Sequence, residues 1–418
     1  MFLELAEIQT LRALTADGRL LFSTRIVRLF AYGFLSVVLT LYLAQLGLTD
    51  RQIGLLLTLT LIGDAAITLG ITLIADRVGR RRMLILGATL MIFAGVAFAL
   101  TNNLLLLIVA AIIGTISPSG SEVGPFLSIE QATLPQTIPD QHRTRIFALY
   151  NLAGSFATAL GALCSGILAQ TLQRSGASTL TSYRAIVIGY GLLGIALLAL
   201  FTTLSAAIEA PRQVDVASKA FMGLHRSRRV VLKLASLFML DSFAGALIIQ
   251  SLLAYWFYLR FGVKPATLGG IFFAGNILAG ISALVAARVA ARFGLINTMV
   301  FTHIPSNLLL LILPLMPNLA LAIITLLIRY SISQMDVPTR QSYTIAVVEA
   351  DERSAAAGIT WVARMAAGAL APVVTGLLLD NGFFSLPFYL AGGLKIVYDL
   401  ALYFNFRRVK PPEEREAS

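Results

Sequence analysis

The stretch LIADRVGRRRML (residues 73–84) places one acid and four arginines in the seven positions from Asp76 to Arg82, between two almost purely apolar segments. Of the 418 residues, 57% are hydrophobic and only 13% are charged, whereas soluble proteins carry roughly 25% charged residues. A chain of this composition cannot cover its surface with polar groups in water. We therefore predict an all-α polytopic membrane protein, because helices satisfy their own backbone hydrogen bonds in lipid.

Apolar runs recur along nearly the whole chain. A helix needs about 20 apolar residues to cross a hydrocarbon layer of about 30 Å. Turn-forming sequences such as TNN (101–103), MPN (316–318) and DNG (380–382) separate several of the runs. We predict twelve transmembrane helices, at 29–47, 53–75, 83–101, 104–130, 145–170, 184–207, 232–259, 266–289, 295–316, 318–341, 355–379 and 384–406.

The basic residues give these helices a direction. With twelve spans, both termini lie on one side of the membrane, and that side carries 24 of the 32 Lys and Arg residues. Because positively charged loops stay in the cytoplasm, we expect both termini there and the protein in the inner (cytoplasmic) cell membrane. The segment Asp76–Arg82 then forms a short cytoplasmic loop between the second and third spans.

Composition also narrows the function classes. The net charge of +11 does not indicate nucleic-acid binding, because the basic residues lie between apolar spans rather than on one soluble face. Cys164 is the single cysteine, so no intrachain disulfide forms, and His142, His225 and His303 lack the spacing of metal ligands. Since the chain also lacks nucleotide-binding and hydrolase motifs, we expect no metal, no cofactor and no enzymatic activity.

Repeats divide the chain into two similar halves. ADRVG (75–79) matches AARFG (290–294), and segment 131–148 matches segment 341–358 at a similar offset. Residues 2–14 also show the apolar spacing of an interfacial helix. We expect five parts: a cytoplasmic N-terminal segment (1–28), a six-helix bundle (29–207), a cytoplasmic linker (208–231), a second six-helix bundle (232–406) and a cytoplasmic tail (407–418).

The charged loop resembles the loop motif of the major facilitator superfamily, which is roughly G-x-L-A-D-R-x-G-R-[RK]-[RK]. Thr72 replaces the first glycine of that motif, and the matching residues are Ala75, Asp76, Arg77, Gly79, Arg80, Arg81 and Arg82. The resemblance implies two pseudo-symmetric six-helix bundles and a transport function. Within that superfamily, segments 113–131 and 335–348 are similar to a prokaryotic subgroup of unplaced substrate.

In that superfamily the loop acts as a cytoplasmic latch. The resemblance implies a gate formed by the matching loop residues, and we expect Glu130 and Arg143 to join them in an ion network. Gly79 permits the tight turn, and the arginines can pair with acids of nearby loops or with anionic lipids. The alternative is a positively charged anchor that sets topology only.

Ionisable residues within the spans are the strongest sign of a functional site, because each is costly in lipid and normally faces a cavity or a partner. Spans one, four, seven and ten line the central cavity in the resembled superfamily. The alternative for each residue is a structural ion pair, such as Arg329 with Asp336 or Asp241, or Lys395 with Asp399. We expect substrate binding or proton coupling at Tyr32, Asp64, Glu122, Asp241, Arg329, Asp336 and Arg364.

We therefore expect a monomeric secondary transporter that moves a small-molecule substrate by alternating access, with protons and membrane lipids as its other partners. Asp64 or Asp241 would bind and release the driving proton, and Arg329 and Arg364 would face an anionic or polar group of the substrate. Efflux of an organic or anionic compound is the favoured direction. The alternatives are uptake by proton symport, lipid or lysolipid translocation, and a non-transporting sensor or scaffold on the same fold.

Overall fold

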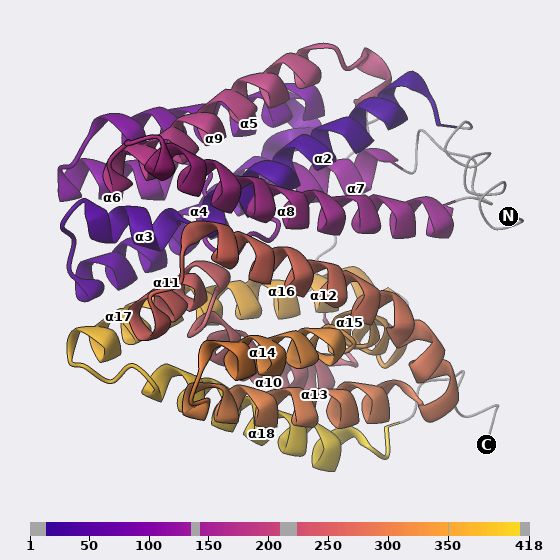
Figure 1. Ribbon diagram of the computed structural model, residues 1–418. Coiled ribbons are helices and arrows are strands. Elements are labelled where there is room, and N and C mark those ends of the chain that lie inside the picture. The colour runs from indigo at the N-terminus through magenta and orange to yellow at the C-terminus, as the bar shows by residue number, and fades with distance from the viewer. Residues whose placement is uncertain (1–13, 135–142, 210–223, 350, 410–418) are drawn as a thin grey trace, which may run out of the picture. The chain divides into compact units, whose positions relative to one another are not determined.

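The computed structural model describes residues 14–134, 143–209, 224–349 and 351–409, and these residues form helices joined by turns and loops (Figure 1). The expected interfacial helix at 2–14 falls outside the described residues except for its last position. Most of the expected linker and of the expected C-terminal tail also falls outside them.

In the described part of the first half, the helices follow one another closely, apart from a long interruption after α6 and the stretch 135–142, which the structure does not describe. Their bounds are α2 (Ala16–Ser36), α3 (Leu39–Gln45), α4 (Asp50–Val78), α5 (Arg80–Leu100), α6 (Leu104–Ile113), α7 (Phe126–Thr133), α8 (Arg143–Arg174), α9 (Thr179–Thr202) and the short 3₁₀ helix η3 (Ala206–Ile208).

The second half repeats this pattern without the long interruption. Its helices are α10 (Arg228–Ala246), α11 (Gln250–Phe261), α12 (Pro265–Phe293), α13 (Leu295–Ile312), the 3₁₀ helix η5 (Leu313–Leu315), α14 (Leu319–Ser333), α15 (Asp336–Ala346), α16 (Arg353–Ala369), α17 (Ala371–Asp380) and α18 (Leu386–Phe406).

These helices lie at the twelve predicted spans. In the described part of the chain, nine helical elements are long and apolar enough to cross a membrane, and α2 with α3 makes a tenth although the chain bends by 43° between them. Helix α18 has a suitable length of 21 residues, but Lys395 and Asp399 in its middle lower its mean hydropathy. The remaining predicted span, 104–130, differs from the prediction.

The fourth span is broken in its middle. Helix α6 ends at Ile113 and α7 begins at Phe126, so residues 114–125, here called the unwound segment, are not helical. Proline at 118 and 125 removes two backbone donors, and glycine at 120 and 124 adopts positive φ angles of 69° and 78°. The prediction of one continuous helix over 104–130 was therefore wrong, because it relied on hydropathy rather than on these helix-breaking residues.

Side chains of the surrounding structure satisfy backbone groups of the unwound segment. The hydroxyl of Tyr190 in α9 donates to the carbonyl of Thr115 at 2.6 Å. Within the segment, the hydroxyl of Ser117 donates to the carbonyl of Ser121 at 2.6 Å. Such pairing is needed because lipid offers no hydrogen-bond partner for a peptide group.

Contacts between residues divide the chain into two compact units. Unit 1 comprises Met1–Leu48, Leu59–Val214 and Gln250–Phe273, and unit 2 comprises Thr49–Thr58, Asp215–Ile249 and Ala274–Ser418. Each unit is built mainly from one half of the chain, but α11 and the first turns of α12 belong to unit 1, and the first turns of α4 belong to unit 2. The bundle bounds expected from the sequence stay a prediction.

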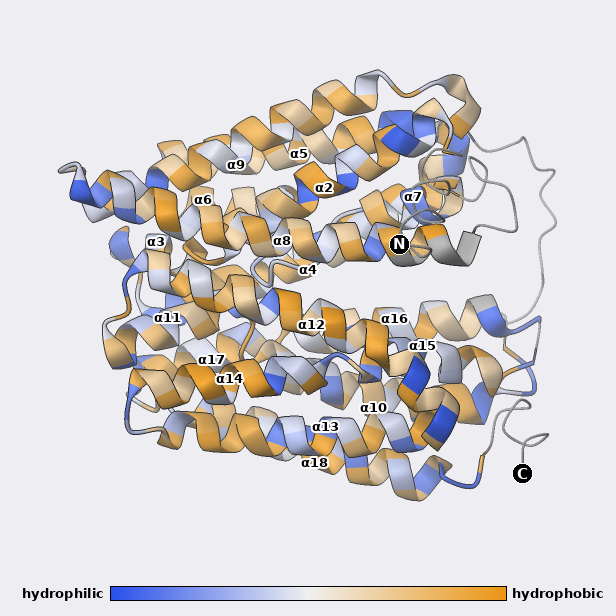
Figure 2. Cartoon of the chain, turned by 45° about the vertical axis from the view of Figure 1, so that its right-hand side comes forward, coloured by the Kyte–Doolittle hydropathy of each residue, from blue (hydrophilic) through white to orange (hydrophobic). Residues whose placement is uncertain are grey.

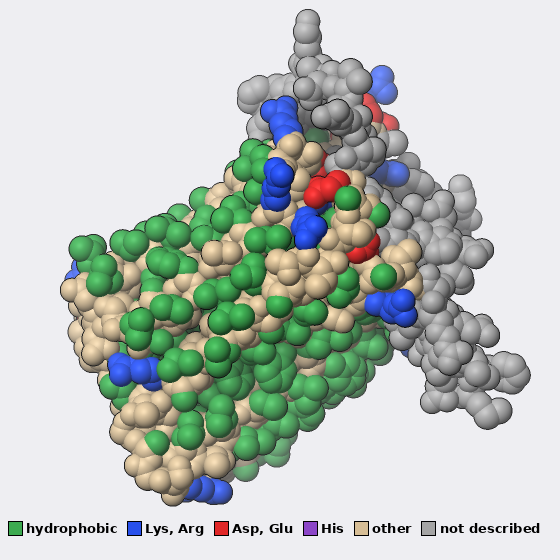
Figure 3. Space-filling view, turned by 90° about the horizontal axis from the view of Figure 1, so that it is seen from above, with side chains coloured by type: hydrophobic (Ala, Val, Ile, Leu, Met, Phe, Trp, Pro, Cys, Tyr) green, Lys and Arg blue, Asp and Glu red, His purple; other side chains and the backbone are tan. Residues whose placement is uncertain are grey.

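The surface suits a lipid environment. The long helices are hydrophobic over most of their length, and hydrophilic residues gather towards their ends (Figure 2). Large apolar side chains are exposed along the helices, including Leu73 (71% exposed) and Leu100 (81% exposed). Hydrophobic side chains also dominate the face seen in Figure 3, where the acidic side chains lie at one end. Acyl chains can cover such a surface, whereas contact with water would be unfavourable.

Small residues bring helices α2 and α8 into close contact. A Cβ atom on Gly33 would lie 2.0 Å from the carbonyl oxygen of Thr158, and one on Gly161 would lie 2.0 Å from that of Phe30. Lipid supplies no hydrophobic drive between helices, so close backbone packing of this kind stabilises their association. Because α2 also carries Arg28, the contact helps to position a candidate site residue.

We predict that Gly161→Leu lowers the melting temperature of the purified protein by several degrees, because overpacking a helix contact costs about 1–3 kcal/mol or more. Gly70→Leu in α4 is the matched control, since a Cβ atom there would have nothing within 4 Å. Thermal unfolding of both variants in the same detergent measures the difference. Equal melting temperatures would show that the α2–α8 contact is looser than described.

Candidate functional site

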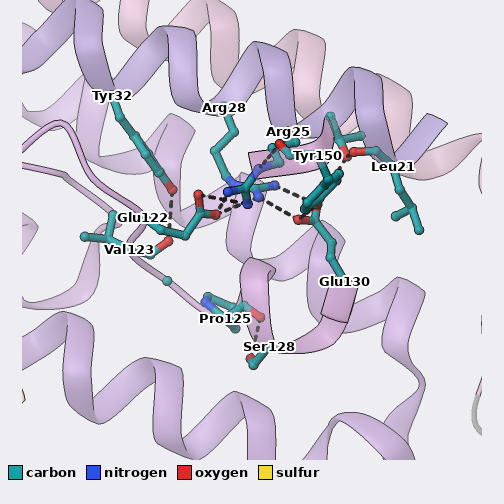
Figure 4. A network of polar contacts seen from close by, with 12 residues as sticks. Leu21, Arg25, Arg28, Tyr32, Glu122, Val123, Pro125, Ser128, Glu130 and Tyr150 are labelled. Carbon is teal, nitrogen blue, oxygen red and sulfur yellow. Dashed lines mark hydrogen bonds and ion pairs between the residues drawn. The ribbon is translucent and has the colours of Figure 1, made fainter. Parts of the chain in front are cut away.

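Arg28 of α2 lies at the centre of a buried ionic network in unit 1 (Figure 4). Its guanidinium donates two parallel hydrogen bonds to Glu130 of α7, at 2.7 and 2.6 Å. It also donates to Glu122 of the unwound segment at 2.7 Å. The planar guanidinium suits such bidentate pairing with a carboxylate. One arginine therefore holds an acid of the unwound segment and an acid of the helix that follows it.

Further groups complete this network. Arg25 Nη1 lies 3.5 Å from Glu122 Oε2, and Arg25 Nε donates to the carbonyl of Tyr150 at 2.9 Å. The hydroxyl of Tyr150 in turn donates to Glu130. Two arginines thus balance two glutamates. The side chain of Glu122 is 15% exposed whereas that of Glu130 is fully buried, so Glu122 is the more accessible of the two acids.

Asp64 lies in the middle of α4, where it contacts the unwound segment but stays outside the ionic network. It is 3% exposed, and its Oδ1 accepts a hydrogen bond of 2.6 Å from the backbone amide of Gly124. Within the described residues, no arginine or lysine forms an ion pair with Asp64. Tyr32, another expected site residue, donates its hydroxyl to the neighbouring carbonyl of Val123 at 3.1 Å.

Asp241 of α10 is the centre of a second buried ionic cluster, which lies in unit 2. Lys395 Nζ is 2.5 Å from its Oδ1, and Arg364 and Arg340 approach its Oδ2 at 2.9 and 3.2 Å. The side chain of Arg364 is 26% exposed, whereas those of Arg340 and Lys395 are 9% exposed. Arg364 is therefore the cation of this cluster that a solute can reach most easily.

Arg329 of α14 forms no ion pair within 4 Å among the described residues. Asp336 was one of its expected partners, but Asp336 pairs with Arg340 at 2.6 Å. The Nε atom of Arg329 is buried and has no hydrogen-bond partner, and its guanidinium carbon lies 5.8 Å from the centre of the Tyr330 ring. Unit 2 thus contains, besides the cluster around Asp241, a cation to which no acid of the described residues bonds directly.

Lys395 and Asp399 do not pair with each other, contrary to one of the expected alternatives. Lys395 bonds Asp241, and Asp399 accepts from Asn307 at 2.9 Å and contacts His303 Nδ1 at 2.8 Å. The one-turn spacing of the two residues permitted a direct pair, but each side chain finds a partner on another helix. In the described part of the chain, no three His, Cys, Asp or Glu side chains are placed to hold a metal ion.

The charged loop is held by local contacts within unit 1. Asp76 pairs with Arg80 at 2.8 Å, and Gly79 between them has a φ angle of 117° that suits glycine alone. Glu209 accepts hydrogen bonds from the backbone amides of Arg80 and Arg81, at 2.6 and 3.3 Å. These amides begin α5, where the helix dipole favours a negative charge. The carboxylate of Glu209 therefore fixes the turn at the end of the motif.

The expected gate network needs one correction. Glu130 does not pair with the charged loop, because Arg28 and Tyr150 engage both of its carboxylate oxygens. Glu209 takes the place that was assigned to Glu130. The side chain of Arg143 lies outside the described residues, so its proposed part in the gate stays a prediction.

Three charged residues that contact the predicted site and loop residues, Arg25, Arg340 and Glu209, were not singled out in the sequence. Arg340 stands one turn after Asp336, and Arg25 stands three residues before Arg28, so helical spacing could have indicated both. Glu209 follows the sixth predicted span at the start of the linker and carries no comparable signal. Its role depends on contacts between segments far apart in the chain, which spacing alone does not predict.

Glu352, in the loop before α16, binds backbone amides at the start of a helix in unit 2, as Glu209 does in unit 1. Its carboxylate accepts hydrogen bonds from the backbone amides of Arg226 and Ser227, both at 2.8 Å, and from that of His225. These amides precede the first turn of α10. Burial opposes ionisation, but the hydrogen bonds from Ser227, His225 and Arg226 outweigh it and lower the pKa of Glu352 from 4.5 to about 2.

We predict that Glu352→Gln lowers the melting temperature at pH 7 and that the difference from the unchanged protein shrinks as the pH falls from about 4.5 towards about 2. The lowered pKa means that the ionised carboxylate stabilises the fold above its unfolded-state pKa, and that this contribution is lost as the pH falls towards the folded-state pKa. Thermal unfolding between pH 7 and pH 3 measures it, with the exposed Glu349→Gln as control. A difference that does not change with pH would contradict the assignment.

Similarity to known proteins supports the same family as the charged loop. The chain is 30% identical over 420 residues to the uncharacterized membrane protein YJR124C of Saccharomyces cerevisiae, an alignment covering 93% of this chain and 94% of that protein. Because this relative is a yeast protein, the comparisons give no support to a prokaryotic subgroup.

Solved structures of transporters share the fold. The D-xylose–proton symporter matches with a TM-score of 0.73 at 16% identity, covering 94% of this chain and 98% of that one. The nucleoside transporter NupG matches with a TM-score of 0.71 at 13% identity, covering 94% and 100% of the two chains. At these identities the likeness shows the fold alone.

The family comparison covers most of the chain, since residues 21–369 match the Major Facilitator Superfamily. The described helices, their apolar surfaces and the charged loop at 76–82 agree with that match. The chain therefore belongs to the Major Facilitator Superfamily and is a multi-pass membrane protein, a secondary transporter rather than an enzyme.

Proposed function

We propose that the protein couples the movement of protons to the transport of a small organic solute that carries a negative charge. The observation that supports this proposal is the balance of charge among the buried ionisable side chains, counted separately in unit 1 and in unit 2. In unit 1, Arg25 and Arg28 balance Glu122 and Glu130, so an ionised Asp64 adds one unpaired negative charge. A buried charge without a partner is costly in lipid.

A proton on Asp64 would remove that negative charge. The carboxylate accepts one backbone hydrogen bond and has no basic partner among the described residues. Buried acids in this position are neutralised by binding a proton rather than by remaining charged. Asp64 is therefore our candidate for the proton-binding group, in preference to Asp241, which three cations keep ionised.

Unit 2 shows the opposite imbalance. Within its spans, the three buried acids Asp241, Asp336 and Asp399 are matched in number by Arg340, Arg364 and Lys395, so Arg329 adds one positive charge in excess when His303 is neutral. A monovalent anionic group of a substrate would neutralise it. Arg364 can contribute to the same recognition because its guanidinium is partly exposed and arginine pairs readily with carboxylates and phosphates.

The location and the orientation of the termini are proposed from the distribution of charge along the sequence. We propose export across the cytoplasmic membrane by a monomer, with both termini on the cytoplasmic side. Uptake by proton symport would use the same residues, with proton and solute moving together. Translocation of an anionic lipid or lysolipid would also use Arg329 and Arg364. A non-transporting sensor or scaffold is disfavoured, because it has no need for an unpaired buried charge.

We predict that Asp64→Asn abolishes transport driven by a pH gradient but preserves exchange of solute across the membrane without a gradient. Asparagine keeps an oxygen that accepts from Gly124 but cannot bind a proton in its place. The assay uses protein in liposomes with an imposed pH gradient of either sign, which also separates antiport from symport. Asp380→Asn, an exposed acid at the end of α17, is the control. Gradient-driven transport by Asp64→Asn at the unchanged rate would rule out Asp64 as the coupling group.

We also predict that Arg329→Gln weakens the binding of an anionic solute about tenfold or more, because hydrogen bonds to charged groups contribute about 1.5–3 kcal/mol. A thermal-shift screen of monocarboxylates, dicarboxylates, sugar phosphates and their uncharged analogues identifies the ligand, since a ligand that binds the folded protein raises its melting temperature. If the uncharged analogues stabilise the protein as well as the anions do, the anionic substrate class is wrong.

A further inference from the structure

The unwound segment is the feature of this structure that the ionic networks alone do not explain. Residues 114–125 interrupt the fourth span, whereas the corresponding span of unit 2 is interrupted only between Ser333 and Asp336. Non-helical backbone at membrane depth is tolerated where protein or a cavity covers it, and in transporters it marks ion and substrate sites. Most of the segment is buried, and Ser119, Ser121 and Glu122 are its more accessible residues.

Three consecutive residues of the segment bond three different side chains of other helices. The side chain of Glu122 bonds Arg28, and the carbonyl of Val123 accepts from Tyr32. The amide of Gly124 donates to Asp64. The candidate proton-binding group and the central ionic network are thus joined by one tripeptide.

We propose that residues 122–124 couple the protonation of Asp64 to the Glu122–Arg28 ion pair, with Gly124 as the positioning residue. This inference rests on the proposed role of Asp64 as the proton-binding group. An ionised carboxylate accepts a strong, charge-assisted hydrogen bond, and a protonated one accepts a weaker one. Protonation therefore loosens the amide of Gly124, and the movement reaches Glu122 because only one residue lies between them.

The local backbone suits this role. Gly124 has a φ angle of 78°, which side-chain-bearing residues rarely adopt. A Cβ atom there would also lie 3.1 Å from ring and methyl carbons of Phe126 and Thr115. Because residues 114–125 form no continuous helix, the carboxylate of Asp64 replaces a helical hydrogen bond at this amide. A change in that one acceptor can shift the segment without breaking a row of helical bonds.

The ionisable side chains around Asp64 determine which residues could cause a change of the segment with pH. Glu122 approaches from the unwound segment, Tyr32 from α2 and Tyr190 from α9, with Arg28 beyond Glu122. Arginine stays protonated and tyrosine stays neutral between pH 5 and pH 8. Asp64 and Glu122 are therefore the two groups whose protonation can change, and the test must separate them.

Hydrogen–deuterium exchange of the full-length protein in lipid nanodiscs, between pH 5 and pH 8, tests the proposal. After correction for the intrinsic effect of pH on exchange, amides of residues 119–124 should exchange about tenfold faster or more at low pH, because the hydrogen bond to Asp64 is weakened. Asp64→Asn should show fast exchange at every pH. Glu122→Gln should keep the pH response, and Asp380→Asn, an exposed acid at the end of α17, should match the unchanged protein.

The Gly124→Ala variant tests whether Gly124 positions its amide for the hydrogen bond to Asp64. The variant retains Asp64 and the amide but strains the backbone, so its segment should exchange quickly at every pH and the pH profile of transport should flatten. Exchange that does not depend on pH in the unchanged protein, or a pH response that survives Asp64→Asn, would overturn the proposal. Loss of the response in Glu122→Gln would also overturn it.

The outcome is separable from that of the proposed function. If Asp64→Asn stops gradient-driven transport while the amides of residues 119–124 show no pH response in the unchanged protein, proton coupling stands and the tripeptide link fails. If the segment responds to pH through Asp64 while Asp64→Asn transports normally, the link stands and Asp64 is not the coupling group for transport.

Discussion

Lipid supplies no partner for a charge, and the buried side chains of this protein are arranged around that constraint. Arg28 pairs with both Glu122 and Glu130, and Asp241 pairs with three cations. Asp64 and Arg329 form no ion pair within the described part of the chain. The two exceptions differ in sign, as expected if a proton and an anion provide the missing partners.

The same constraint explains why the fourth span can be broken. A helix satisfies its own peptide groups, so an unwound segment needs side chains from other helices to replace those bonds. Tyr190, Tyr32 and Asp64 provide them for residues 115, 123 and 124. The replacement makes backbone geometry depend on side-chain chemistry, including the ionisation of an acid. In the proposed coupling, this segment links Glu122 to Asp64, which a continuous helix would not do.

The fold was largely predictable from the sequence because the hydropathy and the length of a helix depend only on residues that are close together in the chain. The spans and the buried position of Asp64 and Asp241 follow from short windows of residues, whereas the loop predicted at 76–82 is reduced to a turn at Gly79 because α4 extends to Val78 and α5 begins at Arg80. Pairing was less predictable, since it depends on which helices are neighbours. Lys395 therefore bonds Asp241 rather than Asp399, and Glu130 bonds Arg28 rather than the charged loop. The break in the fourth span was visible in its prolines and glycines but was hidden by its overall apolar character.

Infrared difference spectroscopy of the protein in lipid tests most directly whether a membrane-buried acid takes up the proton. A protonated carboxyl group has its own carbonyl band, so titration from pH 8 to pH 5 reports the change in charge without requiring a known substrate. The account predicts a carboxyl band that grows as the pH falls and is missing in Asp64→Asn. The same band at the same strength in the unchanged protein and in Asp64→Asn would contradict it.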